Sequence, residues 1–307
     1  MQVILGGGGA IGKGLAQELS ANYRVRVVAR SPKSVPKSVE FYAADLLQPA
    51  AVLRAVEGAE VAYLTAGLRY KTKVWQEEWP RVMRNTIDAC AQTGTRLVFL
   101  DNIYMYDPNH MGHMTEKTPL RPTSQKGKVR AQIALLLMDA VEKGQLQALI
   151  ARSADFYGPK PSNSFIEAMV VDNLVKNKAA MWFVDIHKKH TCTFTPDAAK
   201  ALVLLGNNKA AYNQVWHLPT DPNGLTGQEW IQAFAEVLHR QAKINKLSKT
   251  MIKVLGWFIS VLRESYEMLY QYDRDYFFNS AKFNQQFNFS VTPYAEGIRQ
   301  VVSSLEI

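Results

Sequence analysis

The segment VILGGGGAIGKGL, residues 3–15, joins a short apolar run to the start of an amphipathic helix. Gly6, Gly9 and Gly12 stand three residues apart in it. Glycine allows a tight turn and lets a ligand approach the main chain closely. The start of a helix presents free N–H groups and a positive dipole end to an anion. Between a strand and a helix, this spacing predicts a dinucleotide-binding turn. The residues that we expect at the pyrophosphate are Gly6, Gly9, Ala10, Ile11 and Gly12.

Strand-like runs alternate with helix-like segments through the first half of the chain. The strand-like runs are 2–5, 23–30, 39–45, 59–67, 95–101 and 146–153, and the clearest helices are 11–21, 75–93 and 125–142. Such alternation is typical of βαβ units and of a parallel sheet that is covered on both faces. We therefore predict the α/β class, with a Rossmann-like doubly wound parallel sheet.

The alternation weakens after about residue 160, and residues 226–304 have mostly helical patterns. We predict a dinucleotide-binding domain over 1–160, whose sheet is completed by segments near 190–220. Most of 161–307 is expected to form a smaller, mostly helical substrate lobe.

The composition of the chain indicates which classes of binding partner to expect. The formal net charge of +9 favours anionic ligands, but no dense Lys/Arg block with interleaved aromatic residues occurs, so we expect no nucleic-acid binding. The most apolar late stretch, 251–262, is too short to span a bilayer. No secretory signal is visible, and Cys90 and Cys192 lie in apolar or strand-like stretches, so we expect a cytoplasmic protein with reduced thiols.

The end of the second predicted strand bears on cofactor choice. Arg30 stands where NAD-selective sites place an acidic residue, and an arginine there accommodates the 2′-phosphate of NADP. Lys33 and Lys37 add positive charge nearby, so we predict NADP(H) in preference to NAD(H). The other predicted cofactor residues are Asp45 after the third strand and Thr65, Ala66 and Gly67 at the end of the fourth.

Several further segments resemble the NAD-dependent epimerase/dehydratase family, the extended short-chain dehydrogenase/reductases, over residues 1 to about 240. VFLDNIYMYD (98–107) resembles the strand that leads to the family's VYG, and RSADFYGP (152–159) resembles its RxxNVYGP, with Asp155 in place of asparagine. HTCTFTPDAAKAL (190–202) is similar to RDFVYVDDVARAL. The resemblance implies a Rossmann-like sheet, a nicotinamide cofactor, hydride-transfer chemistry and substrates that are often nucleotide sugars.

The catalytic positions depart from the family pattern. If Tyr106 is the tyrosine of VYG, Asn102 stands at the catalytic Ser/Thr position. The family's Tyr-x-x-x-Lys then corresponds to Ser124 and Lys128, so the lysine is retained as a ribose ligand and the tyrosine is lost. If the alignment is shifted by two residues, Lys126 corresponds to the motif lysine, and Pro122 stands at the tyrosine position.

Another residue must supply the proton if the protein is an enzyme. An extended course beyond residue 101 would place Asn102, Tyr104 and Tyr106 on one side and Asp101 on the other. Our order of candidate acids is Tyr104, then Asp101, then Tyr157, with a structural hydrogen bond as the alternative for each. The predicted catalytic residues are Lys128, Tyr104, Asn102 and Asp101.

His190 aligns with the family's substrate-contacting arginine and is a candidate contact for an anionic substrate. It forms an H-x-x-H pair with His187, as His110 does with His113, but both pairs lie in polar, loop-like stretches and we expect no metal site. The predicted substrate-binding residues are Asn102, Tyr106, Tyr157 and His190.

Two functional hypotheses follow. The first is an NAD(P)-dependent oxidoreductase or epimerase that acts on a small polar or nucleotide-sugar substrate with an atypical proton donor. The alternative is an NADP(H)-binding sensor or scaffold without turnover. We expect a small-molecule partner, anionic or nucleotide-linked, and leave a homodimer open. Membrane-associated partner binding through 251–278 is compatible with either hypothesis.

Overall fold

The computed structural model describes residues 1–32, 39–159 and 164–305. It divides into two compact units, each built from three stretches of the chain. Unit 1 comprises Met1–Met105, Lys126–Ser153 and Pro196–Leu218, and unit 2 comprises Tyr106–Gln125, Ala154–Thr195 and Pro219–Ile307. The units therefore interleave along the chain more than a division at residue 160 implies.

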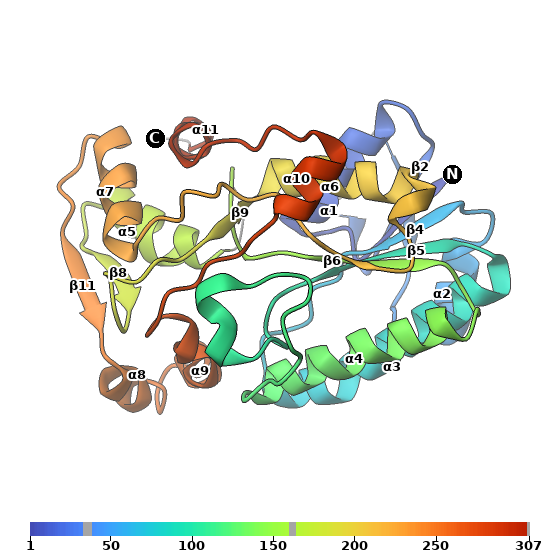
Figure 1. The fold of residues 1–307 in the computed structure, drawn as a ribbon, viewed down its shortest axis with the longest axis horizontal. Helices are drawn as coiled ribbons and strands as arrows, with labels where there is room; N and C mark the ends of the chain where they lie inside the picture. The colour runs from blue at the N-terminus through green and yellow to red at the C-terminus, as the bar shows by residue number, and fades with distance from the viewer. Residues whose placement is uncertain (33–38, 160–163, 306–307) are drawn as a thin grey trace. The chain divides into compact units, whose positions relative to one another are not determined.

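Unit 1 is built around a seven-stranded parallel sheet with the strand order β10-β6-β5-β4-β1-β2-β3 (Figure 1). Its strands are β1 (Gln2–Leu5), β2 (Val25–Ala29), β3 (Glu40–Ala43), β4 (Val61–Leu64), β5 (Arg96–Asp101), β6 (Ala148–Arg152) and β10 (Val215–His217). Its main helices are α1 (Ala10–Ser20), α2 (Pro49–Val56), α3 (Thr72–Thr93), α4 (Gln125–Glu142) and α6 (Thr195–Asn207). Strand order reverses at β1, which pairs with both β2 and β4. The predicted α/β class and doubly wound parallel sheet are confirmed.

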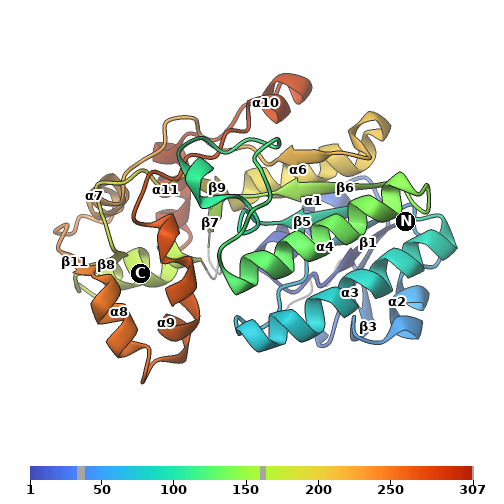
Figure 2. The ribbon, with the colours of Figure 1, turned by 60° about the horizontal axis from the view of Figure 1, so that its bottom comes forward.

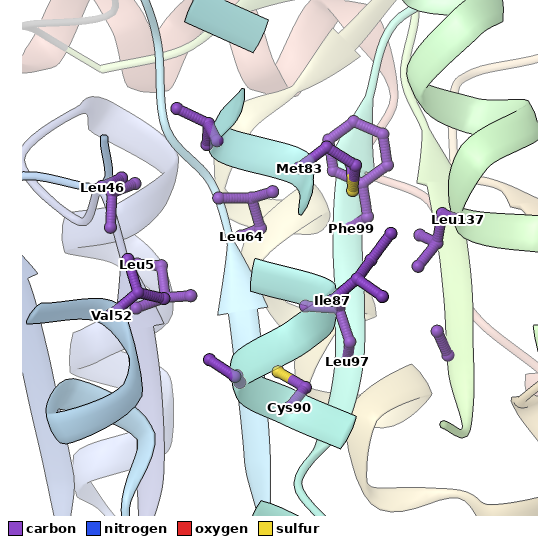
Figure 3. Close-up of a cluster of buried hydrophobic side chains, with 14 of the residues drawn as sticks. Leu5, Leu46, Val52, Leu64, Met83, Ile87, Cys90, Leu97, Phe99 and Leu137 are labelled. Atoms are coloured by element: carbon purple, nitrogen blue, oxygen red, sulfur yellow. The ribbon is translucent and has the colours of Figure 1, made fainter. Parts of the chain in front are cut away.

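Helices cover both faces of this sheet. Figure 2 shows α2, α3 and α4 along one face, with α1 and α6 on the other. On the α3 side, fully buried strand residues such as Leu64 and Phe99 pack against Met83 and Ile87 of α3 (Figure 3). Burial of both faces explains why the central strands are almost continuously apolar.

Unit 2 holds a second core and two small parallel sheets, β11-β8 and β7-β9. Its strands are β7 (Asp155–Tyr157), β8 (Ala180–Phe183), β9 (Cys192–Phe194) and β11 (Ile244–Leu247). Its helical segments are η2 (Pro108–His113), η3 (Glu167–Val171), α5 (Asp172–Val175), α7 (Gly227–Val237), α8 (Lys249–Leu255), α9 (Ser260–Ser265), η5 (Tyr266–Gln271), α10 (Ala281–Phe287) and α11 (Tyr294–Ser303). The predicted helical character of 226–304 holds apart from β11. Within the described ranges, no helix is long and apolar enough to cross a membrane.

Candidate functional site

The glycine turn between β1 and α1 is fixed by close backbone packing. Gly6 has φ +81°, and a Cβ there would lie 2.4 Å from the Cα of Ala66. A Cβ on Gly12 would lie 2.5 Å from the Cα of Gly7. Neither position accommodates a larger residue without movement of the main chain, because real Cβ atoms do not approach backbone atoms so closely.

Gly9 differs from these two glycines. It is the N-cap residue of α1, it has no side chain to cap the helix, and a Cβ built on it meets nothing within 4 Å. The first turn of α1 also contains no acidic residue. The uncapped N–H groups and the positive end of the dipole therefore face open space, which suits a pyrophosphate.

The end of β4 lies beside this turn in the sheet. Thr65 donates its backbone N–H to the Leu5 carbonyl, and its buried Oγ1 has no hydrogen-bond partner in the structure. A buried hydroxyl without a partner is expected to meet a ligand or water. Ala66 packs against Gly6, and Gly67 is exposed.

The residues predicted to bind the adenosine end are at the surface. Arg30 directly follows β2 and is exposed, and Asp45 follows β3, where its carboxylate accepts the backbone N–H of Leu47. Lys33 and Lys37 lie outside the described residues.

The two candidate lysines at the start of α4 have opposite environments. Lys126 is fully buried, its Nζ donates to Thr72 Oγ1 over 2.8 Å, and the same atom lies 4.7 Å from the centroid of the Tyr70 ring. Lys128 is exposed. Lys126 is therefore the lysine that is directed at the segment between β4 and α3.

Asp101 lies at the end of β5 in a buried ion-pair network. Its Oδ1 accepts hydrogen bonds from Arg130 and from the Asn102 backbone N–H, and Arg152 Nε lies 3.8 Å from Oδ2. The Arg130 guanidinium lies 4.5 Å from the Trp79 ring centroid. All three charged side chains are at most 4% exposed. Asp101 is therefore engaged in an internal ion pair and hydrogen bonds of unit 1.

The expected extended course beyond residue 101 is wrong. β5 ends at Asp101, and the Asn102 side chain accepts the Tyr104 N–H over 3.0 Å, which turns the chain. Alternation therefore does not decide where the following side chains point. Tyr104 is half-buried and stacks on Trp75, with ring centroids 6.0 Å apart and an interplanar angle of 18°.

In unit 2, two departures from the family pattern meet. His190 Nε2 lies 2.9 Å from Asp155 Oδ2, so the histidine that replaces an arginine pairs with the aspartate that replaces an asparagine. The His190 ring stacks between Tyr272 and Tyr276, at centroid distances of 4.7 and 4.4 Å. The Tyr272 hydroxyl also donates to Asp155 Oδ2 over 3.3 Å. His190 is 2% exposed and Asp155 is 23% exposed, so the carboxylate is the accessible end of the pair.

The other two predicted substrate residues of unit 2 are enclosed. Tyr106 is fully buried, and Tyr157 is 1% exposed among Phe194, Trp230 and Tyr294. Tyr157 thus occupies an aromatic core position.

Tyr270 is a residue that the sequence did not single out. Burial raises the pKa of its hydroxyl above the usual range, and the neighbouring Ser124 side chain offsets part of that rise. Ser124 is the residue expected at the tyrosine position if Lys128 is the equivalent lysine, and the Tyr270 phenol lies beside it. No local pattern connects residues 124 and 270.

The H-x-x-H pairs do not assemble a metal site within the described ranges. His113 stacks on Phe277, and His110 Nδ1 lies 3.7 Å from Asp107 Oδ2.

We compared the chain with known protein families and with solved structures. A sequence model of the "NAD dependent epimerase/dehydratase family" matches residues 2–217. Human "3 beta-hydroxysteroid dehydrogenase type 7" is 39% identical over 87 residues, which are 26% of this chain and 24% of the human protein. The match thus spans about a quarter of that relative's length.

Solved structures agree over nearly the whole fold. UDP-glucose 4-epimerase of Thermus thermophilus, in complex with NAD, is 20% identical and has a TM-score of 0.79, and the match covers 99% of this chain and 98% of the epimerase. A double mutant of dTDP-glucose 4,6-dehydratase from Streptomyces venezuelae, with NAD bound, has the same TM-score at 16% identity, with 99% and 96% of the chains covered. The fold, the glycine turn and the match over residues 2–217 lead to one conclusion: this chain belongs to the NAD-dependent epimerase/dehydratase family.

Proposed function

We propose that this protein is an NAD(P)-dependent oxidoreductase or epimerase that acts on a nucleotide sugar or a related small polar substrate by hydride transfer. The observation that carries the cofactor part is the uncapped start of α1, where Gly9 leaves open space at free N–H groups. A bound nicotinamide dinucleotide would supply the hydride acceptor and donor.

The residues of unit 1 have distinct parts in holding that cofactor. The turn from Gly6 to Gly12 receives the pyrophosphate, and Thr65 offers its free hydroxyl at the end of β4. NAD-selective sites have a carboxylate at this position that accepts a hydrogen bond from the ribose 2′-hydroxyl, and Arg30 lacks one. This supports our preference for NADP(H). The NAD-bound structural relatives give that preference no support.

We assign the lysine role to Lys126 in place of Lys128. A ribose ligand must reach the carboxyl edge of the sheet, and the Lys126 ammonium already reaches Thr72 beyond the end of β4. The exposed position of Lys128 gives it no comparable support.

For the proton donor we retain Tyr104 as first choice. It is half-buried, directly follows β5, and lies in the same unit as the cofactor residues. The ion pairs of Asp101 and the enclosure of Tyr157 weigh against those two. Tyr270 becomes the competitor, because its buried hydroxyl lies beside Ser124, two residues before Lys126.

Support for the substrate class comes from the relatives and from the Asp155–His190 pair. Both structural relatives are named for nucleotide-sugar substrates. The partly exposed Asp155 carboxylate offers a hydrogen-bond acceptor to a sugar hydroxyl, and its bond to His190 fixes its orientation.

The test separates turnover from binding alone. The purified protein is incubated with NAD⁺ or NADP⁺ and a set of UDP- and dTDP-hexoses, while sugar products are followed by NMR and cofactor reduction by absorbance. We expect conversion of at least one sugar. Tight cofactor binding with no conversion of any oxidised or reduced substrate would favour the alternative, a cofactor sensor or scaffold.

A further inference from the structure

Large hydrophobic side chains gather on one exposed part of unit 2. In the described part of the chain, seven of the ten exposed large hydrophobic residues lie between 251 and 266. Trp257 is 73% exposed and Phe258 is 82% exposed. We call the central group the apolar tip: Met251, Val254, Trp257, Phe258, Ile259 and Val261.

An ordered helical hairpin displays the apolar tip. α8 and α9 lie side by side and are joined by a turn, seen at the lower end of unit 2 in Figure 2. The turn is close, because a Cβ on Gly256 would lie 3.1 Å from the Cα of Arg263. The N–H groups of Trp257 and Phe258 bond to carbonyls of α8. Ile252, which is fully buried, anchors the hairpin to the core of unit 2.

The sequence that leads into and through the apolar tip is rich in basic residues. From residue 240 to residue 263 the chain contains six basic residues and no acidic one, and all six are exposed: Arg240, Lys243, Lys246, Lys249, Lys253 and Arg263. Nearby acids neutralise part of this charge, since Asp273 pairs with Lys249 and Glu264 follows Arg263. Exposed aromatic side chains flanked by basic residues are complementary to a surface with an apolar interior and an outer layer of negative charge.

We propose that this hairpin docks on the surface of an anionic lipid bilayer, with Trp257 and Phe258 inserted at the headgroup level. Tryptophan favours that level, and basic residues beside an apolar face strengthen attachment to anionic lipids. A second copy of the chain fits less well. A two-fold interface through the tip would bring the same lysines and arginines of both copies together. α8 has seven residues, so the hairpin would lie in the interface rather than span the membrane.

Vesicle flotation of the full chain tests this proposal. The vesicles are phosphatidylcholine alone, or phosphatidylcholine with about a third phosphatidylglycerol, a composition that gives a strong negative surface potential. We expect attachment to the anionic vesicles that weakens as salt is added. The double variant Trp257→Ser/Phe258→Ser should bind at least about tenfold more weakly. Lys253→Glu should lose about fivefold or more, because each basic residue near the surface contributes about that factor.

Leu135→Ser is the matched control, because Leu135 is also exposed, at 58%, but lies in unit 1. It should bind vesicles like the unchanged protein. Urea unfolding midpoints establish that each variant is folded. Absence of attachment to anionic vesicles, or attachment that the tip variant leaves intact, overturns the proposal. A dimer in light scattering that only the tip variant dissociates also overturns it, in favour of a second copy.

Discussion

The buried ion-pair network at the end of β5 gives a direct prediction about stability. Asp101 is fully buried, and Arg130 and Arg152 beside it are 4% and 3% exposed at the side chain. Asp101→Asn keeps the shape but removes the carboxylate that pairs with the buried Arg130 guanidinium. Breaking a buried pair from one side costs about 3–5 kcal/mol, and the retained amide oxygen places this variant near the lower end, at about 3 kcal/mol.

Urea unfolding followed by circular dichroism measures this loss. Asp139→Asn is the control, because its pair with Lys143 is more than half exposed, and we expect a change within about 0.5 kcal/mol. In a double-mutant cycle, Asp101→Asn and Arg130→Met should cost less together than the sum of the single changes. An Asp101→Asn protein that is as stable as Asp139→Asn would refute the reasoning. If it also lost all turnover, Asp101 would be the better candidate for the acid.

The remaining predictions concern the cofactor and the proton. Lys126→Met should weaken cofactor binding about tenfold or more in calorimetry, because a charge-assisted hydrogen bond is lost, whereas Lys128→Met should change it less than about twofold. Tyr104→Phe should lower kcat about 100-fold without unfolding the protein, and an equal loss in Tyr270→Phe with normal Tyr104→Phe turnover would move the role to Tyr270. Arg30→Asp should reverse a preference for NADPH over NADH, and equal affinities in both proteins would contradict the cofactor choice.

The fold was predictable because its signals are local. The glycine spacing, the apolar runs and the alternation of strands and helices all act within short stretches of chain. The predicted strand 2–5 and helix 125–142 coincide with β1 and α4. The course beyond β5 was not predictable from alternation, because the Asn102 side chain competes with the strand for the following N–H group.

The site was less predictable because it depends on helix rotation and on contacts across long stretches of chain. Lys126 lies three and seven residues before the buried Val129 and Ile133, so helical spacing places it on the inner face of α4. That signal was available, but the Tyr-x-x-x-Lys register outweighed it. The approach of Tyr270 to Ser124 and the pairing of Asp155 with His190 join residues that no local period connects.

The central claim is that a nicotinamide dinucleotide binds at the start of α1. Calorimetric titration of the full chain with NAD(P)⁺ tests it in the Gly9→Ala variant, with Gly112→Ala as the control. An added Cβ meets nothing within 4 Å at either glycine, so both variants should fold normally. We expect Gly9→Ala to weaken binding about tenfold or more, because the methyl group occupies the space that the pyrophosphate needs. Gly112→Ala should bind like the unchanged protein. Unchanged cofactor affinity in Gly9→Ala, or no binding by the unchanged protein, would contradict the account.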